Sequence, residues 1–286
     1  GRAVRFGGLQ YTTNFQIQPG LVTAPVPTFN GQAALPSMVD LYVNNVLQSS
    51  TRIPPGPFSI ITAPIVSGDG EVIVKVRDIS GREELISGRF YSSPLMLAPG
   101  LSDFSFEVGA LRRNFGIQGD EYGDLFGSAS YRKGMSEKLT LEGGVQGARG
   151  GPYGLLGGAS TAVPGWGTAS LAAAVSQGDE GSGFQVSAGF ERRTALNAFA
   201  VRSERANEKF DQIGIDKNFR TICRDSAFWT YRLGDMGSLG LSYTRQQRIA
   251  SEVTKVTSIS FSTQRSRWGQ FTINVLESRE IGRAHI

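Results

Sequence analysis

Residue types that commonly do chemistry are scarce in this sequence. It has one histidine, His285, beside the end of the chain, and one cysteine, Cys223, with no second Cys or His at the spacing of metal ligands. A Ser-His-Asp triad or a histidine metal site is therefore not expected, and no Gly-x-Ser-x-Gly elbow occurs. We expect a protein that is not an enzyme and that has no cofactor.

Two acidic clusters and a glycine pattern are the remaining candidates. One cluster is Asp120, Glu121 and Asp124, and the other is Asp179-Glu180. Either could bind a cation through oxygen ligands, but solvated loops are the simpler interpretation. Gly165-x-Gly167-x-x-Ser170 is superficially like a dinucleotide loop, yet no strand-to-helix context surrounds it. We interpret these glycines as turn residues and predict no metal site.

Charge and composition narrow the class of protein. The net charge of +4 comes from Arg and Lys residues that are interleaved with Asp and Glu, so no basic stripe suggests nucleic-acid binding. The 37 glycines and 12 prolines favour strands and turns. No run of about 18 apolar residues predicts a transmembrane helix, whereas a membrane barrel crosses with alternating strands. The chain starts at Gly1 without a signal peptide, so if the parent protein is exported we expect this chain to be a mature internal segment or a truncated piece of it.

From Asp103 onward the sequence is a series of alternating segments, each close to the ~10 residues of a membrane-crossing strand. Apolar residues on one face alternate with small and polar residues on the other, as in the run from Phe104 to Ala110. About ten such segments exceed the strand number of an ordinary sandwich. The pattern favours part of a wide barrel with a polar interior. Six aromatic residues could form interfacial girdles or fill a core: Trp166, Trp229, Trp268, Tyr153, Tyr231 and Tyr243.

Before Asp103 the pattern differs. Residues 1 to 14 predict one strand of the later type, and the prolines between residues 19 and 36 indicate a linker. Residues 35 to 97 predict a small β-domain with a hairpin turn at Asn44-Asn45 and an alternating strand through Val72, Val74 and Val76. About 60 residues is small for an independent domain, which favours an insertion that the barrel supports at both ends.

Particular motifs carry a resemblance to a known family. The segment Val39-Asp40-Leu41-Tyr42-Val43-Asn44-Asn45, followed by Ile53-Pro54-Pro55-Gly56-Pro57-Phe58, resembles the plug region of fimbrial usher proteins. Gly70 to Gly81 resembles the next plug strands, and Tyr91-Ser92-Ser93-Pro94-Leu95 resembles the return from plug to barrel. The resemblance is strong from Val39 to Arg113, continues more weakly to Glu277, and ends before Arg279.

The resemblance implies a fold and a function. The fold class is all-β, part of a large antiparallel transmembrane β-barrel with an inserted small β-sandwich plug domain. The function is that of an outer-membrane usher, which secretes and assembles pilus subunits delivered by a periplasmic chaperone while the plug gates the pore. The implied partners are chaperone-pilin complexes, pilus subunits and outer-membrane lipid, with neither nucleic acid nor a small-molecule substrate.

Domain limits and site residues follow from the same resemblance. We expect a barrel strand in residues 1-24, the plug with its linkers in 25-100, barrel strands in 101-278 and an atypical tail in 279-286. The proposed structural corner of the plug is Pro54, Pro55, Gly56, Pro57 and Phe58, because proline fixes φ and shapes a loop at low entropy cost. Arg112 and Arg113 are candidates for lumenal ion pairs that hold the plug closed.

Alternative functions remain open at this point. The chain lacks the family's N-terminal and C-terminal periplasmic domains and its final strands, so we predict that it does not form a working pore alone. The alternatives are another outer-membrane porin or transporter, a secreted all-β adhesin, and a barrel hydrolase. The single terminal histidine makes the hydrolase the weakest of these.

Overall fold

The structure is a computed structural model that describes residues 5–18, 21–25, 28–61, 68–112, 122–250, 253–263 and 271–281. The described residues form β-strands joined by turns and by three short 3-10 helices, η1 Phe15–Ile17, η2 Lys217–Phe219 and η3 Gly234–Met236. None of their helices is long and apolar enough to cross a membrane. This all-β content agrees with the fold class that the sequence predicts.

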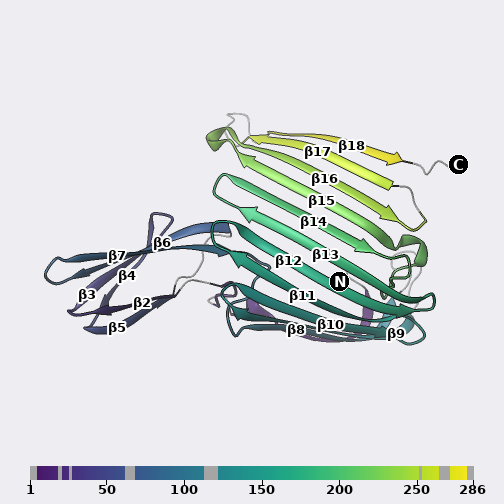
Figure 1. Cartoon of the computed structure of the whole chain (residues 1–286), viewed down its shortest axis with the longest axis horizontal. Coiled ribbons are helices and arrows are strands. Elements are labelled where there is room, and N and C mark those ends of the chain that lie inside the picture. Colours follow the sequence, from purple (N-terminus) through teal and green to yellow (C-terminus); the bar gives the residue numbers. More distant parts are fainter. Residues whose placement is uncertain are drawn as a thin grey trace.

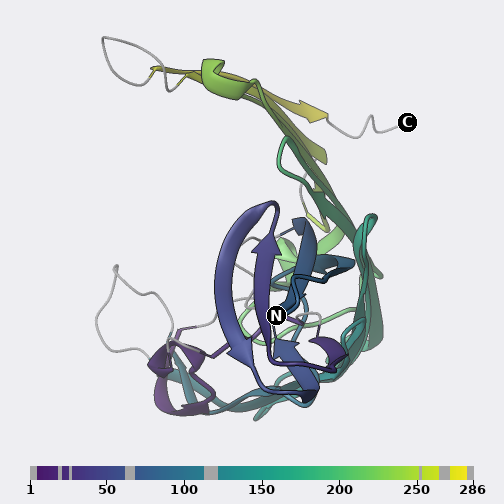
Figure 2. The same cartoon turned by 90° about the vertical axis from the view of Figure 1, so that its left-hand side faces the viewer.

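One large antiparallel sheet contains most of the described strands. Within the described residues it has 12 strands in the order β1-β8-β9-β10-β11-β12-β13-β14-β15-β16-β17-β18. It curves into an open arc whose strands run obliquely across it (Figures 1 and 2). The strand bounds are β1 Phe6–Thr12, β8 Ser102–Arg112, β9 Tyr122–Ser136, β10 Leu139–Ala148, β11 Tyr153–Val163, β12 Gly167–Gly178, β13 Gly181–Arg193, β14 Asn197–Ala206, β15 Thr221–Arg232, β16 Ser238–Arg248, β17 Val253–Thr263 and β18 Phe271–Ile281.

The two faces of this sheet differ in polarity, as the alternation predicts. On β12, Leu171 and Val175 are 65% and 55% exposed on the outer, convex face. The intervening residues, such as Ser170 and Ser176, point to the inner, concave face. Register carries the alternation from strand to strand, because Leu171 lies opposite Ala188 of β13. The sheet therefore has an apolar outside and an inside of small and polar residues.

A second unit is inserted between β1 and β8, which are neighbours in the large sheet. It has a four-stranded sheet in the order β4-β3-β6-β7 and a two-stranded sheet of β2 and β5. We call these the inserted sheets, and they are purple to blue in Figure 1. Their bounds are β2 Thr28–Ala33, β3 Ser37–Val43, β4 Val46–Ile53, β5 Gly56–Ile61, β6 Gly68–Asp78 and β7 Glu83–Ser92.

The inserted sheets have their own apolar core. Val39 and Leu41 of β3 and Val72 and Val74 of β6 are buried on one face, and Phe58 of β5 packs against them. The two sheets thus pack face to face as a small sandwich. The buried valines are those whose alternation the sequence analysis identified, because every second residue of a strand points to the same face.

The β3-β4 hairpin has the tight turn that the sequence predicts. Asn44 and Asn45 have φ values of 49° and 65°, between the paired residues Val43 and Val46. Positive φ at both central residues is the type I′ geometry that matches strand twist, and asparagine tolerates it better than most residues. The Asn44 side chain also accepts a 2.9 Å hydrogen bond from the amide of Glu71, which ties the turn to β6.

The proline-rich segment lies where the chain changes sheets. Pro54 and Pro55 join the end of β4, in the four-stranded sheet, to the start of β5, in the two-stranded sheet. Gly56 has φ +133°, a conformation that side-chain-bearing residues rarely adopt. Pro57 lies opposite Gln32 of β2, and β5 has only this one neighbouring strand among the described residues. A residue without an amide donor is tolerated on such a strand.

Candidate functional site: the junction of the inserted sheets and the barrel wall

The inserted sheets meet the large sheet at one of its ends. We call this the junction end; β1 ends there and β8 begins there, and the turns after β9, β11 and β13 lie there. We call the opposite end, where β8 ends at Arg112, the remote end. The inserted sheets lie at the junction end, in front of the arc in Figure 2.

Tyr91, near the end of β7, is the central side chain of the junction. It is 4% exposed, and its hydroxyl oxygen accepts a 2.9 Å hydrogen bond from the Arg193 amide and donates to the Glu191 carbonyl at 3.5 Å. Burial raises the pKa of Tyr91, so the hydroxyl stays neutral and keeps its proton for donation. The Ser93 hydroxyl adds a 2.5 Å hydrogen bond to the Glu191 carboxylate. These contacts attach the inserted sheets to β13.

Asp69 of β6 makes the second set of junction contacts. Its carboxylate forms a 2.6 Å ion pair with Arg89 of β7 and accepts a 3.2 Å hydrogen bond from the Gly165 amide in the β11-β12 turn. The neighbouring Gly68 has φ +111°, and a Cβ there would lie 2.5 Å from the Arg193 carbonyl oxygen. Backbone therefore approaches backbone at this point, which only glycine allows.

The chain returns to the large sheet along a buried segment. Met96 and Leu97 are both 2% exposed, and the Leu97 amide donates a 2.9 Å hydrogen bond to the Thr140 hydroxyl on β10. Further along, the Gly100 amide donates to the Gly134 carbonyl at 2.8 Å. The return segment is thus fixed to the barrel wall, whereas the inserted sheets contact the wall through the few groups around Tyr91 and Asp69.

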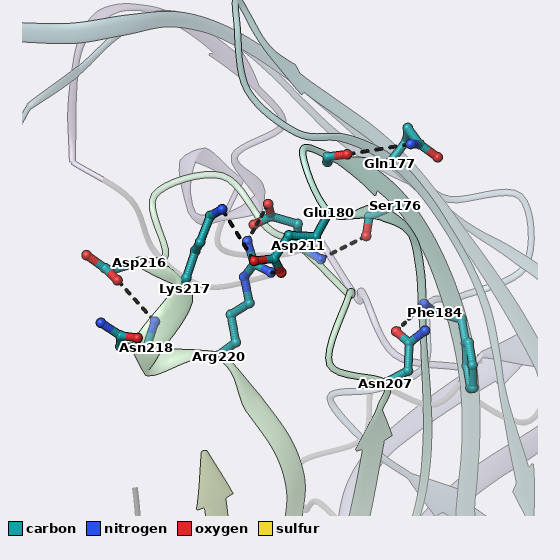
Figure 3. A network of polar contacts seen from close by, with 11 residues as sticks. Ser176, Gln177, Glu180, Phe184, Asn207, Asp211, Asp216, Lys217, Asn218 and Arg220 are labelled. Atoms are coloured by element: carbon teal, nitrogen blue, oxygen red, sulfur yellow. Dashed lines mark hydrogen bonds and ion pairs between the residues drawn. The ribbon is translucent and has the colours of Figure 1, made fainter. Parts of the chain in front are cut away.

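A second polar network lies at the remote end, where the long connection between β14 and β15 crosses the inner face (Figure 3). Arg220, whose side chain is 6% exposed, pairs with Asp211 at 2.7 Å and with Glu180 at 2.9 Å. Lys217 lies 3.3 Å from Glu180, and this contact, more than any other, lowers the pKa of Glu180. Burial raises the pKa of Asp211, an effect that outweighs the attraction of Arg220.

Close packing fixes this connection against the wall. The Ser176 hydroxyl accepts a 2.8 Å hydrogen bond from the Asp211 amide, and a Cβ on Gly183 would lie 2.2 Å from the Cα of Phe210. Glu180 thus has two cationic neighbours, which matches the loop interpretation of Asp179-Glu180. The part of the chain that the structure describes contains no group of acidic, His and Cys side chains suited to a metal ion.

The structure separates the predicted site residues. The segment from Pro54 to Phe58 lies within the inserted sheets, as described above. Arg112 ends β8 at the remote end, about 34 Å along the strand from Ser102, so it is not brought to the junction. The reason is strand length, because a residue at the far end of an 11-residue strand cannot reach the end at which the insertion is attached. Arg113 lies outside the described residues.

Other predicted residues fall in several places. Trp166 is 69% exposed in the turn at the junction end, and Trp229 stacks on Tyr231 with ring centroids 6.0 Å apart. Asp120, Glu121, Trp268 and His285 lie outside the described residues. No sequence pattern predicts the contacts of Tyr91, Asp69 and Glu191, since only the folded chain brings β6, β7 and β13 together. The one signal for Tyr91 is its place in the motif that resembles the return from plug to barrel.

These features define a class of protein: a membrane β-barrel wall, apolar outside and polar inside, that carries a small sandwich inserted between two adjacent strands. The model of the family described as outer membrane usher protein matches residues 2–284. The chain therefore belongs to the outer-membrane usher family and to the bacterial outer membrane. The match extends to residue 284 and β18 extends to Ile281.

Individual relatives agree with the family match. The chain is 27% identical over 275 residues to the outer membrane usher protein FimC of Bordetella pertussis, covering 85% of this chain and 31% of that protein. It is 30% identical over 138 residues to the usher FaeD of Escherichia coli, covering 48% of this chain and 16% of that protein. The chain thus spans less than a third of the length of these curated relatives.

Solved structures show the same fold. The translocation pore of the P pilus usher PapC matches 99% of this chain and 60% of its own length, with a TM-score of 0.58 and 20% identity. The E. coli P pilus tip assembly intermediate PapC-PapD-PapK-PapG matches 99% of this chain and 37% of the matched chain, with a TM-score of 0.70 and 19% identity. At this identity the likeness establishes the fold.

Proposed function

We propose that this chain forms part of the pore wall and the plug of an usher that secretes and assembles pilus subunits delivered by a periplasmic chaperone. The observation that carries the proposal is the direct pairing of β1 with β8, from Phe6 opposite Leu111 to Thr12 opposite Ser105. The wall is therefore continuous without the insertion. The inserted sheets can change position without breaking the ladder of hydrogen bonds that forms the wall.

The junction is suited to a two-state gate. The inserted sheets have their own core, so we expect them to move as one body. Among the described residues their polar contacts with the wall are few: Tyr91 with Arg193 and Glu191, Ser93 with Glu191, and Asp69 with Gly165. Tyr91 also packs against Ala162 of β11. Each such hydrogen bond contributes about 0.5–1.5 kcal/mol net. A junction of this strength favours the closed arrangement when no partner is bound. A partner that binds the open arrangement more tightly than the closed one can shift the equilibrium to the open arrangement.

The proposed partners are chaperone-pilin complexes and pilus subunits, with outer-membrane lipid around the wall. Support for them comes from the family match and from the assembly intermediate in which PapC occurs with PapD, PapK and PapG. The work we propose is not catalysis of bond making or breaking. It is the passage of folded subunits, whose joining by strand addition uses main-chain hydrogen bonds. The small and polar inner face suits such passage, since it offers few apolar contacts.

Permeability of living cells tests the gating role. Cells that produce the full-length usher containing this chain are compared with cells that produce a version without residues 28–92, with the ends joined by a short Gly-Ser linker. We expect the deletion to admit a large antibiotic that the intact outer membrane excludes, and to abolish surface pili. Equal antibiotic uptake by the two strains, at equal amounts of barrel in the outer membrane, would exclude a plug role for the inserted sheets.

A further inference from the structure

A row of basic side chains crosses the outer face of the last strands near the remote end. Arg245 of β16 lies directly opposite Lys255 of β17, and Lys255 lies directly opposite Arg279 of β18. The exposed apolar residues Leu241 and Ile259 lie four residues away on β16 and β17, and they point to the same face because side chains alternate along a strand. The basic row therefore borders the apolar band of the barrel wall.

Like charges directly opposite one another destabilise a sheet. An anion bound between these cations would offset their repulsion. Asp225, opposite Arg245, is already bound by Arg205 through two hydrogen bonds of 2.7 and 3.0 Å. On β18, Arg279 forms a 2.5 Å ion pair with Glu277. Asp225 and Glu277 are therefore each paired with an arginine.

Arg245 and Lys255 are left without a carboxylate. Among the residues whose side chains the structure describes, no Asp or Glu forms an ion pair with either side chain. The Nε of Arg245 is buried and has no hydrogen-bond partner among them. Both side chains are partly exposed on the outer face. Two adjacent cations thus face the surroundings of the barrel.

We propose that Arg245 and Lys255, with Arg279 beside them, bind the phosphate groups of an outer-leaflet lipid whose acyl chains lie along the apolar band. Neighbouring strands are about 4.8 Å apart, so one phosphate can accept hydrogen bonds from a planar guanidinium and an ammonium together. Exposed Trp229 and Tyr243 on the same face are of the type that lies at headgroup level. The inference rests on the outer-membrane location of the barrel and is independent of the gating role.

The position of the row selects the outer leaflet. Apart from the insertion, the longest connection that the structure describes between successive strands, residues 207–220, lies at the remote end. Outer-membrane barrels have their longer loops outside the cell and short turns in the periplasm. The basic row therefore lies at the outer boundary of the apolar band, where the headgroups of phosphorylated glycolipids gather.

Binding of a defined lipid tests the proposal. The full-length usher, purified in detergent, is titrated with fluorescent bisphosphorylated lipid A and with the same lipid after removal of both phosphates. We expect the wild type to prefer the phosphorylated lipid and the double variant Arg245→Gln, Lys255→Gln to bind it roughly 30-fold more weakly, at a loss of about fivefold per cation. Equal affinity of wild type and double variant, or equal affinity for the two lipids, would overturn the proposal.

Control variants separate a specific effect of Arg245 and Lys255 from a general loss of charge or of folding. Arg224→Gln removes an exposed arginine that is adjacent to Asp225 in sequence and points to the inner face, so it should bind lipid A as the wild type does. The exchange Arg245→Lys, Lys255→Arg keeps the charge and should retain most of the affinity. Heat-modifiable gel mobility reports folding of each variant. Displacement of lipid A by equimolar inorganic phosphate would show a free-anion site and contradict a lipid site.

Discussion

At the scale of single residues, the junction depends on Tyr91. Its hydroxyl is buried, bonds to two backbone groups of β13 and stays protonated. Removing only the oxygen leaves the Arg193 amide without its acceptor, and an unsatisfied buried amide costs about 1–3 kcal/mol. Removing the Tyr91 hydroxyl should therefore weaken the attachment of the inserted sheets to the wall without changing the apolar core of those sheets.

Tyr91→Phe should therefore weaken the closed arrangement. We expect spontaneous opening of the channel to become roughly tenfold more frequent, which corresponds to about 1.4 kcal/mol, within the range for such a lost partner. Single-channel recording of the full-length usher measures the opening frequency. Tyr153→Phe is the matched control, since Tyr153 is 62% exposed on β11. An unchanged opening frequency in Tyr91→Phe would mean that the hydroxyl does not hold the gate.

Asp78 gives the inserted sheets a pH dependence. Its carboxylate accepts hydrogen bonds from the Ser80 hydroxyl at 2.6 Å, the Ser80 amide at 2.8 Å and the Arg82 amide at 3.0 Å, and the first of these does most to lower the pKa of Asp78. A lowered pKa in the folded state means that the stabilisation is complete above the unfolded pKa of about 3.9 and is lost as the pH falls through the folded pKa.

The β6-β7 turn should therefore open in acid. Hydrogen exchange of the Ser80 and Arg82 amides, corrected for the intrinsic rate, should show protection at pH 6 that falls below pH ~4. In Asp78→Asn the protection should already be low at pH 6 and should change little with pH. Protection in the wild type that is equal at pH 6 and pH 3 would contradict this account.

At the scale of elements, the sequence predicts the strands and turns that depend only on residues close together in the chain. The alternation of Val72, Val74 and Val76 identified a strand with one buried face, and Asn44-Asn45 identified a hairpin turn, because both depend on neighbours in sequence. The junction could not be predicted in this way. Tyr91 and Glu191 are 100 residues apart, and no periodicity reports which turn of the wall the inserted sheets approach.

The role of Arg112 in holding the inserted sheets closed stays a prediction. The end of the barrel at which Arg112 lies depends on the direction of β8 relative to the insertion, which the sequence alone does not show. The connection 207–220 was likewise beyond prediction. Its docking on the inner face depends on Gly183 and Ser176, small residues that are equally consistent with any pore-lining strand.

The first prediction at this scale concerns the proline-rich segment from Pro54 to Phe58. Pro55→Ala with Pro57→Ala should lower the stability of the inserted sheets by roughly 0.4–1 kcal/mol per proline, because alanine gives the unfolded chain more conformations. Pulse proteolysis of the full-length usher in increasing urea measures the unfolding of this unit. Pro152→Ala, in the β10-β11 turn of the wall, should leave that transition in place. An unchanged transition in the double variant would remove the structural role proposed for this segment.

A second prediction at this scale concerns the connection 207–220, which Arg220 holds against the inner face of the wall. Arg220→Met leaves Asp211 and Glu180 without their shared cation, and breaking a buried ion pair typically costs about 3–5 kcal/mol. We expect the connection to detach from the inner face and become sensitive to protease while the barrel keeps its heat-modifiable mobility. The charge-preserving Arg220→Lys should retain part of the protection. Full protease resistance in Arg220→Met would show that the ion pairs of Arg220 are not needed to hold the connection.

At the scale of the whole molecule, the described sheet is an arc with β1 at one edge and β18 at the other, and these two strands do not pair with each other. Unpaired strand edges cannot be satisfied by lipid, so a barrel needs further strands to close. We therefore expect the 286-residue chain by itself to give no stable channels in a planar bilayer. Steady channels from this chain alone would show that it closes by another route, such as pairing between copies.

The gate itself is tested most directly by single-channel conductance of the full-length usher in planar bilayers, with and without residues 28–92. The account predicts that the intact protein is quiet apart from brief openings and that the deletion gives a large channel that stays open, since β1 and β8 keep the wall continuous. An intact protein that conducts as much as the deletion would contradict the claim that the inserted sheets close the pore.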